Sequence, residues 1–143
     1  MPGNVTIIDG DENFCESGWY PFTGHCYHLN KTAVQWRDAQ TQCKRQKSYL
    51  VEVNTAAENK WLLETFLTAN GNGISQPVTS LWLGAKRRKG ILMWGHSNNP
   101  ISKQSWVTEN LDGKGGCVLM KHTGMWIDVG CSWDEYFVCE KML

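Results

Sequence analysis

The chain of 143 residues contains no run of about 18 apolar residues, which argues against a membrane-spanning helix. Its formal net charge is zero, because 14 basic side chains balance 14 acidic ones. This balance gives no electrostatic reason to expect nucleic acid or an anionic membrane as the partner. Its first residues lack the basic region and apolar core of a signal peptide, so we expect a mature domain with an added start methionine.

Motifs of catalysis are also missing. None of the four histidines accompanies a serine or free cysteine in a recognisable nucleophile setting. His25 and His28 flank Cys26, a spacing that suits zinc only if Cys26 is unpaired. No glycine-rich phosphate loop follows a predicted strand, and no pair of carboxylates is marked as a hydrolytic dyad. The sequence therefore predicts a binding protein and not an enzyme.

Cysteine, in contrast, is plentiful. Six cysteines are present and no two have the Cys-x-x-Cys spacing of a redox or zinc site: Cys15, Cys26, Cys43, Cys117, Cys131 and Cys139. This density indicates a disulfide framework formed in an oxidising compartment, and hence a secreted, extracellular protein. Six cysteines allow about 15 pairings, and spacing alone leaves the choice among them open.

The first half of the chain has helical patterning. Residues 1–14 are polar and predict a loose lead-in to a domain that spans residues 15–143. After a short hairpin, Thr32 is the predicted N-cap of a helix with Ala39 and Cys43 on one face. A strand is predicted over 49–53, and Asn54 or Thr55 is expected to cap a second helix that ends near Leu67.

The second half is richer in turns and strands. An apolar strand is predicted over 80–85, followed by a long irregular region over 86–116. Loops of that length in a small domain are usually functional. Three further strands are predicted over 117–121, 126–129 and 136–139, with a turn at Thr123-Gly124. Helices first and antiparallel strands later predict an α+β fold in a single domain.

Several short motifs follow one another in a specific order: Gly18-Trp19, the helix with Cys43, Leu50-Val51 before Ala57-Glu58, Trp82-Leu83-Gly84, Trp94, Trp106, Cys117-Val118, Trp126-x-Asp128, Cys131 and Phe137-Val138-Cys139-Glu140. In this order they resemble the C-type lectin-like domain over nearly the whole chain. The resemblance implies two helices packed on antiparallel sheets, a long irregular ligand loop, and disulfides Cys15–Cys26, Cys43–Cys139 and Cys117–Cys131. The first disulfide marks the long form of the family, here of the invertebrate-type secreted lectins.

Sugar-binding members of this family hold a calcium ion in the long loop. The family uses a Glu-Pro-Asn or Gln-Pro-Asp triplet, an acid shortly before the next cysteine, and a Trp-Asn-Asp triplet. Here the first triplet falls on Asn110-Leu111-Asp112, Gly115 stands where the acid is expected, and Ile127 replaces the asparagine beside Asp128. The remaining ligands would be Asn110, Asp112 and Asp128, with Glu109 as a fourth if the register slips by one. Three ligands rarely hold calcium firmly.

Three hypotheses follow for this loop. It has drifted and binds no sugar, it binds sugar weakly through calcium, or it binds sugar directly without the metal. Direct binding would use hydrogen bonds and ring stacking from Asn110, Asp112, Asp128, Glu109, His122, Trp106 and Trp126. We expect sugar binding in one of the last two forms, on cell-surface or microbial glycans and with a role in innate immunity. The alternative is a protein-binding domain that uses residues 86–89 and the long loop.

The resemblance also implies a structural calcium site in some members, between the second helix and the last strand. This chain has Glu52, Asn54, Glu58 and Glu140 in those places. Oxygen ligands from three segments would suit calcium, the cofactor that the resemblance suggests. The alternative is a solvated acidic cluster paired with Lys60 or Lys141. Since the implied disulfides use all six cysteines, the expected oligomer is a non-covalent homodimer, whose two sites would add avidity.

Overall fold

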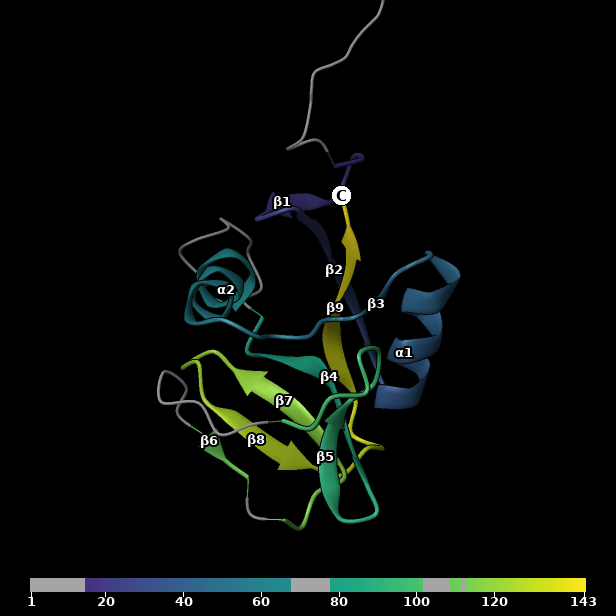
Figure 1. Ribbon diagram of the computed structural model, residues 1–143, viewed down its shortest axis with the longest axis vertical. Helices are drawn as coiled ribbons and strands as arrows, with labels where there is room; N and C mark the ends of the chain where they lie inside the picture. Colours follow the sequence, from purple (N-terminus) through teal and green to yellow (C-terminus); the bar gives the residue numbers. More distant parts are fainter. Residues whose placement is uncertain (1–14, 68–77, 102–108, 112) are drawn as a thin grey trace, which may run out of the picture.

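The sheet is built around the pairing of the first long strand with the last. The computed structural model describes residues 15–67, 78–101, 109–111 and 113–143 (Figure 1). β2 (His25–Val34) and β9 (Glu135–Met142) are antiparallel neighbours. The other described strands are β1 (Tyr20–Phe22), β3 (Tyr49–Leu50), β4 (Ser80–Arg88), β5 (Ile91–Trp94), β6 (Glu109–Asn110), β7 (Cys117–Lys121) and β8 (Trp126–Val129). They form one sheet in the order β1-β2-β9-β4-β7-β8-β6, with β3 added to β9 and β5 added to β4.

Two helices flank this sheet, α1 (Trp36–Arg45) on one side of the β2–β9 pair and α2 (Ala56–Leu62) on the other (Figure 1). The predicted α+β fold is therefore confirmed. α1 buries Trp36, Ala39 and Cys43, which share one helical face. The indole Nε1 of Trp36 donates to Leu83 O at 2.9 Å. A buried indole N–H needs such a partner, so this bond fixes α1 against β4.

The start of α1 differs from the prediction. Thr32 lies within β2, and the helix begins only at Trp36, after Gln35 at the N-cap. The side chain of Gln35 makes no capping hydrogen bond. The reason is tertiary, because β2 continues along β9 beyond an irregularity in the register between Asn30 and Val34. Strand pairing therefore overrides the local capping signal of Thr32.

The N-cap of α2 agrees with the prediction. The backbone N–H of Glu58 donates to the hydroxyl oxygen of Thr55 at 3.1 Å, the bond expected of a threonine cap. After Leu62 the helix continues as the π-helical turn η1 (Leu63–Leu67), which buries Phe66 and Leu67. The predicted strand over 49–53 is shorter than expected, since β3 covers only its first two residues.

The predicted irregular region over 86–116 is partly wrong. β4 runs to Arg88 and returns as β5, joined by a two-residue turn at Lys89 and Gly90, with Arg88 facing Ile91. Both turn residues have positive φ, 51° and 83°, the conformation of tight hairpin turns. The sequence did not reveal this hairpin, because its first turn position holds lysine where such turns usually have the dipeptide Asn-Gly or Asp-Gly. Residues 102–108 lie outside the described residues.

All three disulfides implied by the resemblance are present: Cys15–Cys26, Cys43–Cys139 and Cys117–Cys131. The bridge between Cys43 and Cys139 ties α1 to β9 across 96 residues of sequence. In the chain-entropy model a loop of that length is worth about 4.7 kcal/mol. No helix in the described part of the chain is long and apolar enough to cross a membrane.

Candidate functional site

Asp128 lies on β8 and its carboxylate is enclosed by the protein's own donors. Asp128 Oδ2 accepts from Arg87 Nη2 at 3.0 Å, from Gly115 N at 2.9 Å and from Gly113 N at 3.1 Å. The side chain of Asp128 is only 1 % exposed, and that of Arg87 is 22 % exposed. The cation that neutralises the Asp128 carboxylate is therefore the guanidinium of Arg87 on β4.

This arrangement corrects the role predicted for Asp128. A carboxylate that is buried and satisfied by three donors cannot also turn outward to a sugar hydroxyl. Gly115 explains the missing acid of the family pattern, since a Cβ at this position would overlap the backbone of Asp128 and Val129. Asp128 is thus the acidic partner in an internal ion pair, with the Gly115 amide as a further donor, and neither residue is placed as a calcium ligand.

Trp126 also has a different role from the predicted one. Its side chain is 1 % exposed, and its Nε1 donates to Asn59 Oδ1 at 3.0 Å. Its ring meets the Trp94 ring edge to face, with centroids 5.8 Å apart. Trp126 is therefore a core residue that joins β8 to α2, and it offers no face on which a sugar ring could stack.

The other predicted sugar contacts lie on β6 and in the turn between β7 and β8. Glu109 and Asn110 form β6, which pairs in parallel with β8 beside Trp126 and Ile127. His122 is exposed in the turn after β7, whereas Asp128 pairs with Val118. Four residues of strand separate these levels, roughly 13 Å. The structure therefore does not bring His122 and Asp128 together. Trp106 and Asp112 lie outside the described residues.

A cavity of about 350 Å³ opens next to β6 and was missed at the level of sequence. It is lined by the following residues: Val53, Asn54, Trp94, Asn99, Pro100, Ile101 and Trp126. Its described lining residues carry no charged side chain, and their polar groups include the amides of Asn54 and Asn99, both on exposed residues. The turn-forming run over 97–100 after β5 was the signal that could have indicated this site.

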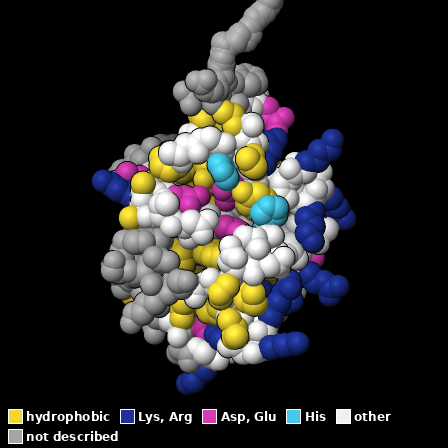
Figure 2. All heavy atoms as spheres, viewed as in Figure 1, with side chains coloured by type: hydrophobic (Ala, Val, Ile, Leu, Met, Phe, Trp, Pro, Cys, Tyr) yellow, Lys and Arg dark blue, Asp and Glu magenta, His cyan; other side chains and the backbone are white. Residues whose placement is uncertain are grey.

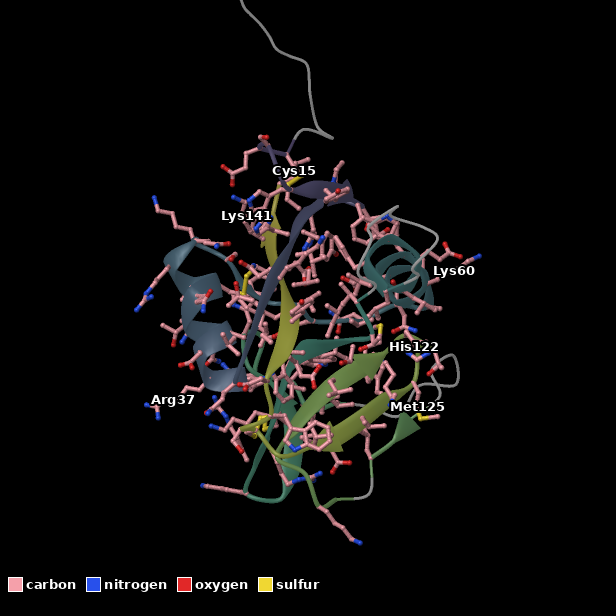
Figure 3. All side chains as sticks on the ribbon, turned by 180° about the vertical axis from the view of Figure 1, so that it is seen from behind. Cys15, Arg37, Lys60, His122, Met125 and Lys141 are labelled. Atoms are coloured by element: carbon pink, nitrogen blue, oxygen red, sulfur yellow. A yellow bond between two sulfur atoms is a disulfide. The ribbon has the colours of Figure 1, made fainter. Side chains whose placement is uncertain are left out.

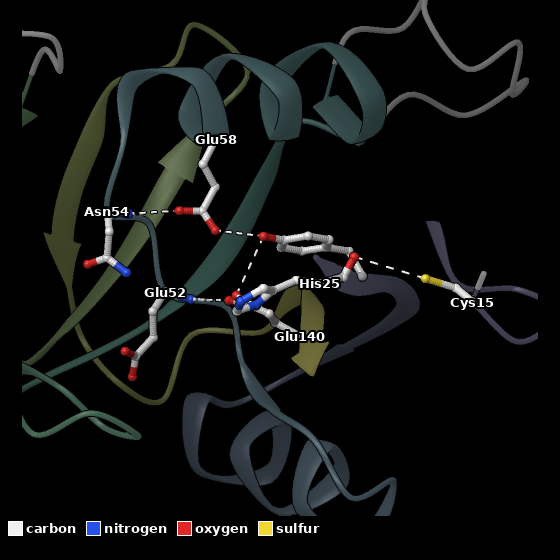
Figure 4. A network of polar contacts seen from close by, with 7 residues as sticks. Cys15, His25, Glu52, Asn54, Glu58 and Glu140 are labelled. Carbon is white, nitrogen blue, oxygen red and sulfur yellow. Dashed lines mark hydrogen bonds and ion pairs between the residues drawn. The ribbon is translucent and has the colours of Figure 1, made fainter. Parts of the chain in front are cut away.

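The predicted calcium ligands form a buried hydrogen-bonded cluster, shown in Figure 4. Glu52, Glu58 and Glu140 are at most 8 % exposed. Tyr27 Oη donates to Glu58 Oε2 at 2.7 Å and lies 3.5 Å from Glu140 Oε2. His25 Nδ1 lies 2.6 Å from the same oxygen of Glu140. The alternative of a solvated acidic cluster paired with lysines is therefore wrong.

Backbone donors occupy most of the other carboxylate oxygens in this cluster. Glu140 Oε1 accepts from Glu52 N at 3.1 Å, and Glu58 Oε1 accepts from Asn54 N at 2.8 Å. Glu52 Oε2 turns away to the amides of His96 at 2.7 Å and Ser97 at 3.1 Å. In the described ranges no group of three or more His, Cys, Asp or Glu side chains could hold a metal ion. In this structure Glu52, Asn54, Glu58 and Glu140 are thus arranged as a polar network, and the calcium site stays a prediction.

Crowding of carboxylates affects protonation in this network. Burial, and then the negative charge of Glu58, raise the pKa of Glu140 to about 8. Burial and the charge of Glu140 also raise the pKa of Tyr27 well above its ordinary range. Tyr49 on β3 behaves likewise, from burial and the same charge. The two phenols therefore remain hydrogen-bond donors toward the carboxylates at any physiological pH.

The helix-flanked sheet and the three disulfides agree with the fold that the sequence motifs imply. A family model described as "Lectin C-type domain" matches residues 32–141. The chain belongs to the C-type lectin domain family, which consists of non-enzymatic binding proteins.

The human protein "C-type lectin domain family 17, member A" is 29 % identical to the chain over 138 residues, which cover 94 % of the chain and 34 % of that protein. Human "C-type lectin domain family 4 member G" is 29 % identical over 141 residues, covering 89 % of the chain and 43 % of that protein. The chain thus spans less than half the length of these curated relatives.

Solved structures share the fold at lower identity. Human lithostathine has a TM-score of 0.74 and 24 % identity, covering 96 % of this chain and 97 % of that one. The carbohydrate-recognition domain of the mouse scavenger receptor C-type lectin has a TM-score of 0.72 and 22 % identity, and the match covers 90 % of this chain and 96 % of that one. A calcium-independent type II antifreeze protein has a TM-score of 0.72 and 18 % identity, and the match covers 90 % of this chain and 95 % of that one. These matches establish the fold.

Proposed function

We propose that the chain is a secreted lectin that binds cell-surface or microbial glycans without calcium. The observation that carries this proposal is the ion pair of Arg87 with Asp128, which places a fixed protein cation beside the carboxylate. A calcium ion would have to compete with this guanidinium and two backbone amides for Asp128. The fold is shared both by a carbohydrate-recognition domain and by a calcium-independent protein, so it accommodates either property.

The cavity beside β6 is the proposed sugar site. Its volume of about 350 Å³ falls within the roughly 300–1,000 Å³ typical of small-ligand pockets. The amides of Asn54 and Asn99 both donate and accept hydrogen bonds, which suits neutral hydroxyl groups. Since Glu109 pairs with Trp126 in the register, β6 adjoins this cavity. Glu109 and Asn110 are accordingly proposed as further contacts at its edge.

A glycan array tests the proposal, with the purified domain applied once in calcium and once in EDTA. We expect the same glycans to bind in both buffers. Binding that disappears in EDTA would contradict calcium independence, and an array without signal in either buffer would contradict the lectin function itself.

A pair of variants locates the site. Asn54→Ala combined with Asn99→Ala should weaken glycan binding by about tenfold or more, because each removes a side-chain hydrogen bond worth about 1 kcal/mol. Gln35→Ala is the matched control, since Gln35 is exposed and makes no capping bond. Equal affinities for the two variants would exclude the cavity as the sugar site.

The alternative function, protein binding, has one observation in its favour. The β4–β5 hairpin presents Arg88 and Lys89 beside Ile91, whose side chain is 55 % exposed. A basic tip with an exposed apolar residue is typical of a protein contact. This alternative would be favoured if no glycan on the array bound the domain, while a cell-surface protein bound it and the variant Ile91→Ser abolished that binding.

Secretion and self-association are further parts of the proposal. Three disulfides are typical of proteins that fold in an oxidising compartment. They use all six cysteines, so a homodimer would be non-covalent. Light scattering that gives a single monomer mass at the concentrations used for the array would contradict the dimer.

A further inference from the structure

The zero net charge conceals an uneven distribution of charge. Among the described residues, four acidic side chains are buried, namely Glu52, Glu58, Glu140 and Asp128. Setting aside these four and Arg87, the partner of Asp128, leaves ten acidic and thirteen basic side chains in the rest of the chain. Figure 2 shows that Lys and Arg side chains gather along the side of the molecule that carries α1. We therefore expect a positive surface potential there although the whole chain is neutral.

A groove lies at the C-terminal end of α1, within this basic side. Its volume is about 430 Å³, and it is lined by the following residues: Glu16, Ser17, Trp19, His28, Arg45, Gln46, Lys47 and Lys141. Three cations thus come together from the end of α1, from the turn after it and from β9. Figure 3 shows Lys141 beside Cys15 and β1, at the opposite end of α1 from Arg37.

One wall of the groove is fixed by a stack of side chains. The Trp19 ring lies against the His28 ring at 5.2 Å between centroids, and Lys141 Nζ lies 4.1 Å from the Trp19 centroid. Lys141 also pairs with Glu16, and His28 Nδ1 lies 2.8 Å from Gly18 O. These contacts engage the half-buried indole, so a ligand in the groove would be bound chiefly through charge and hydrogen bonds.

The opposite wall provides cations that are available to a ligand. In the part of the chain that the structure describes, neither Arg45 nor Lys47 forms an ion pair with a carboxylate. Arg45 compensates the negative end of the α1 dipole, but Lys47 lies beyond the helix. Lys47 has a φ of 57°, in the left-handed region where glycine or asparagine is usual after a helix. Lys47 is exposed and lines the groove, and a lysine in this conformation carries some cost to the backbone.

We propose that this groove is a second binding site, for the sulfate groups of a sulfated polysaccharide. An arginine guanidinium binds a sulfate through two parallel N–H donors, as it binds phosphate, and lysines add charge. Ser17 and Gln46 can bond to hydroxyl groups between the sulfates. The groove is open rather than enclosed, so a polymer can pass through it. Trp19 is half-buried and is the one large apolar side chain among the described lining residues, which argues against a lipid surface as the ligand.

Heparin, as a sulfated polysaccharide probe, tests the proposal. The double variant Arg45→Gln/Lys47→Gln should bind immobilised heparin about tenfold more weakly than the unmodified chain at about 0.1 M NaCl. The matched control is Arg88→Gln/Lys89→Gln, which also removes one exposed arginine and one exposed lysine with positive φ. We expect the control to change affinity by less than about twofold.

Other outcomes would overturn the proposal. An unmodified chain that heparin does not retain has no such site, and equal weakening in both double variants would mean that binding follows total charge alone. Retention equal on heparin and on hyaluronan, which carries carboxylates without sulfates, would refute the preference for sulfate. Both double variants should keep the melting temperature of the unmodified chain and its binding of unsulfated glycans on the array, so failure at the groove is separable from failure of the lectin proposal.

Discussion

Removing the guanidinium of Arg87 should destabilise the fold strongly. The variant Arg87→Met keeps much of the side-chain volume but leaves the 1 % exposed Asp128 carboxylate without its cation. It also removes the bond from Arg87 Nε to Gly115 O at 3.0 Å. Breaking a buried ion pair typically costs 3–5 kcal/mol. Since Arg87 is itself 22 % exposed, we take the lower end, about 3 kcal/mol, or a loss of about 10 °C in melting temperature.

Urea and thermal denaturation with intact disulfides measure this effect. Arg88→Met is the matched control, because Arg88 is exposed at the end of the same strand, and it should cost less than about 0.5 kcal/mol. In the double variant Arg87→Met/Asp128→Asn the buried charge is gone, so it should be more stable than Arg87→Met alone by about 1–3 kcal/mol. The reasoning is refuted if Arg87→Met and Arg88→Met are equally stable, or if Asp128→Asn brings no recovery.

Three other measurements test the site and the core. Neither calcium nor EDTA should shift the melting temperature by more than about 1 °C. A true calcium site would shift it further, because calcium at about 100 times its Kd adds about 2.7 kcal/mol to the free energy of unfolding. Between about pH 5 and pH 8 the free energy of unfolding should fall as pH rises, because folded Glu140 (pKa about 8) retains a proton that the unfolded chain releases near pH 4.3. Glu140→Gln should flatten that slope and the exposed Glu64→Gln should keep it; identical slopes would disprove the assignment. Gly84→Ala should cost about 2 kcal/mol or more in urea denaturation, since its Cβ would overlap Leu50 O, while Gly130→Ala, with only ordinary contacts, should be near neutral.

Elements with strong local signals were predictable from sequence. β7 and β8 have the predicted bounds, since short apolar runs on either side of the Thr123-Gly124 turn leave little choice. The Thr55 cap is also a local signal, for it depends on the backbone N–H of Glu58 three residues later. The three disulfides followed from the resemblance and not from spacing.

Features that depend on distant partners were not predictable in this way. Thr32 alone is a favourable N-cap residue, but it lies within β2 because this strand pairs with β9. Asp128 was interpreted as an outward ligand because nothing near it in sequence reveals Arg87, 41 positions away. The same applies to Glu140, whose partner His25 lies on the N-terminal hairpin. In each case the deciding partner lies across the sheet.

The pairing of β2 with β9 has a practical consequence for handling the protein. His25 faces Met142 in the register, and Leu143 N donates to Gly24 O at 2.9 Å, so the C-terminal residue lies against the β1–β2 turn. Cys15 is tied to the same hairpin through Cys26. A linker or affinity tag fused to Leu143 would emerge near Lys141 and the basic groove, whereas the cavity at Trp94 and Trp126 lies on other strands. Sensors for acidic ligands should therefore carry the polysaccharide on the chip and leave the protein in solution.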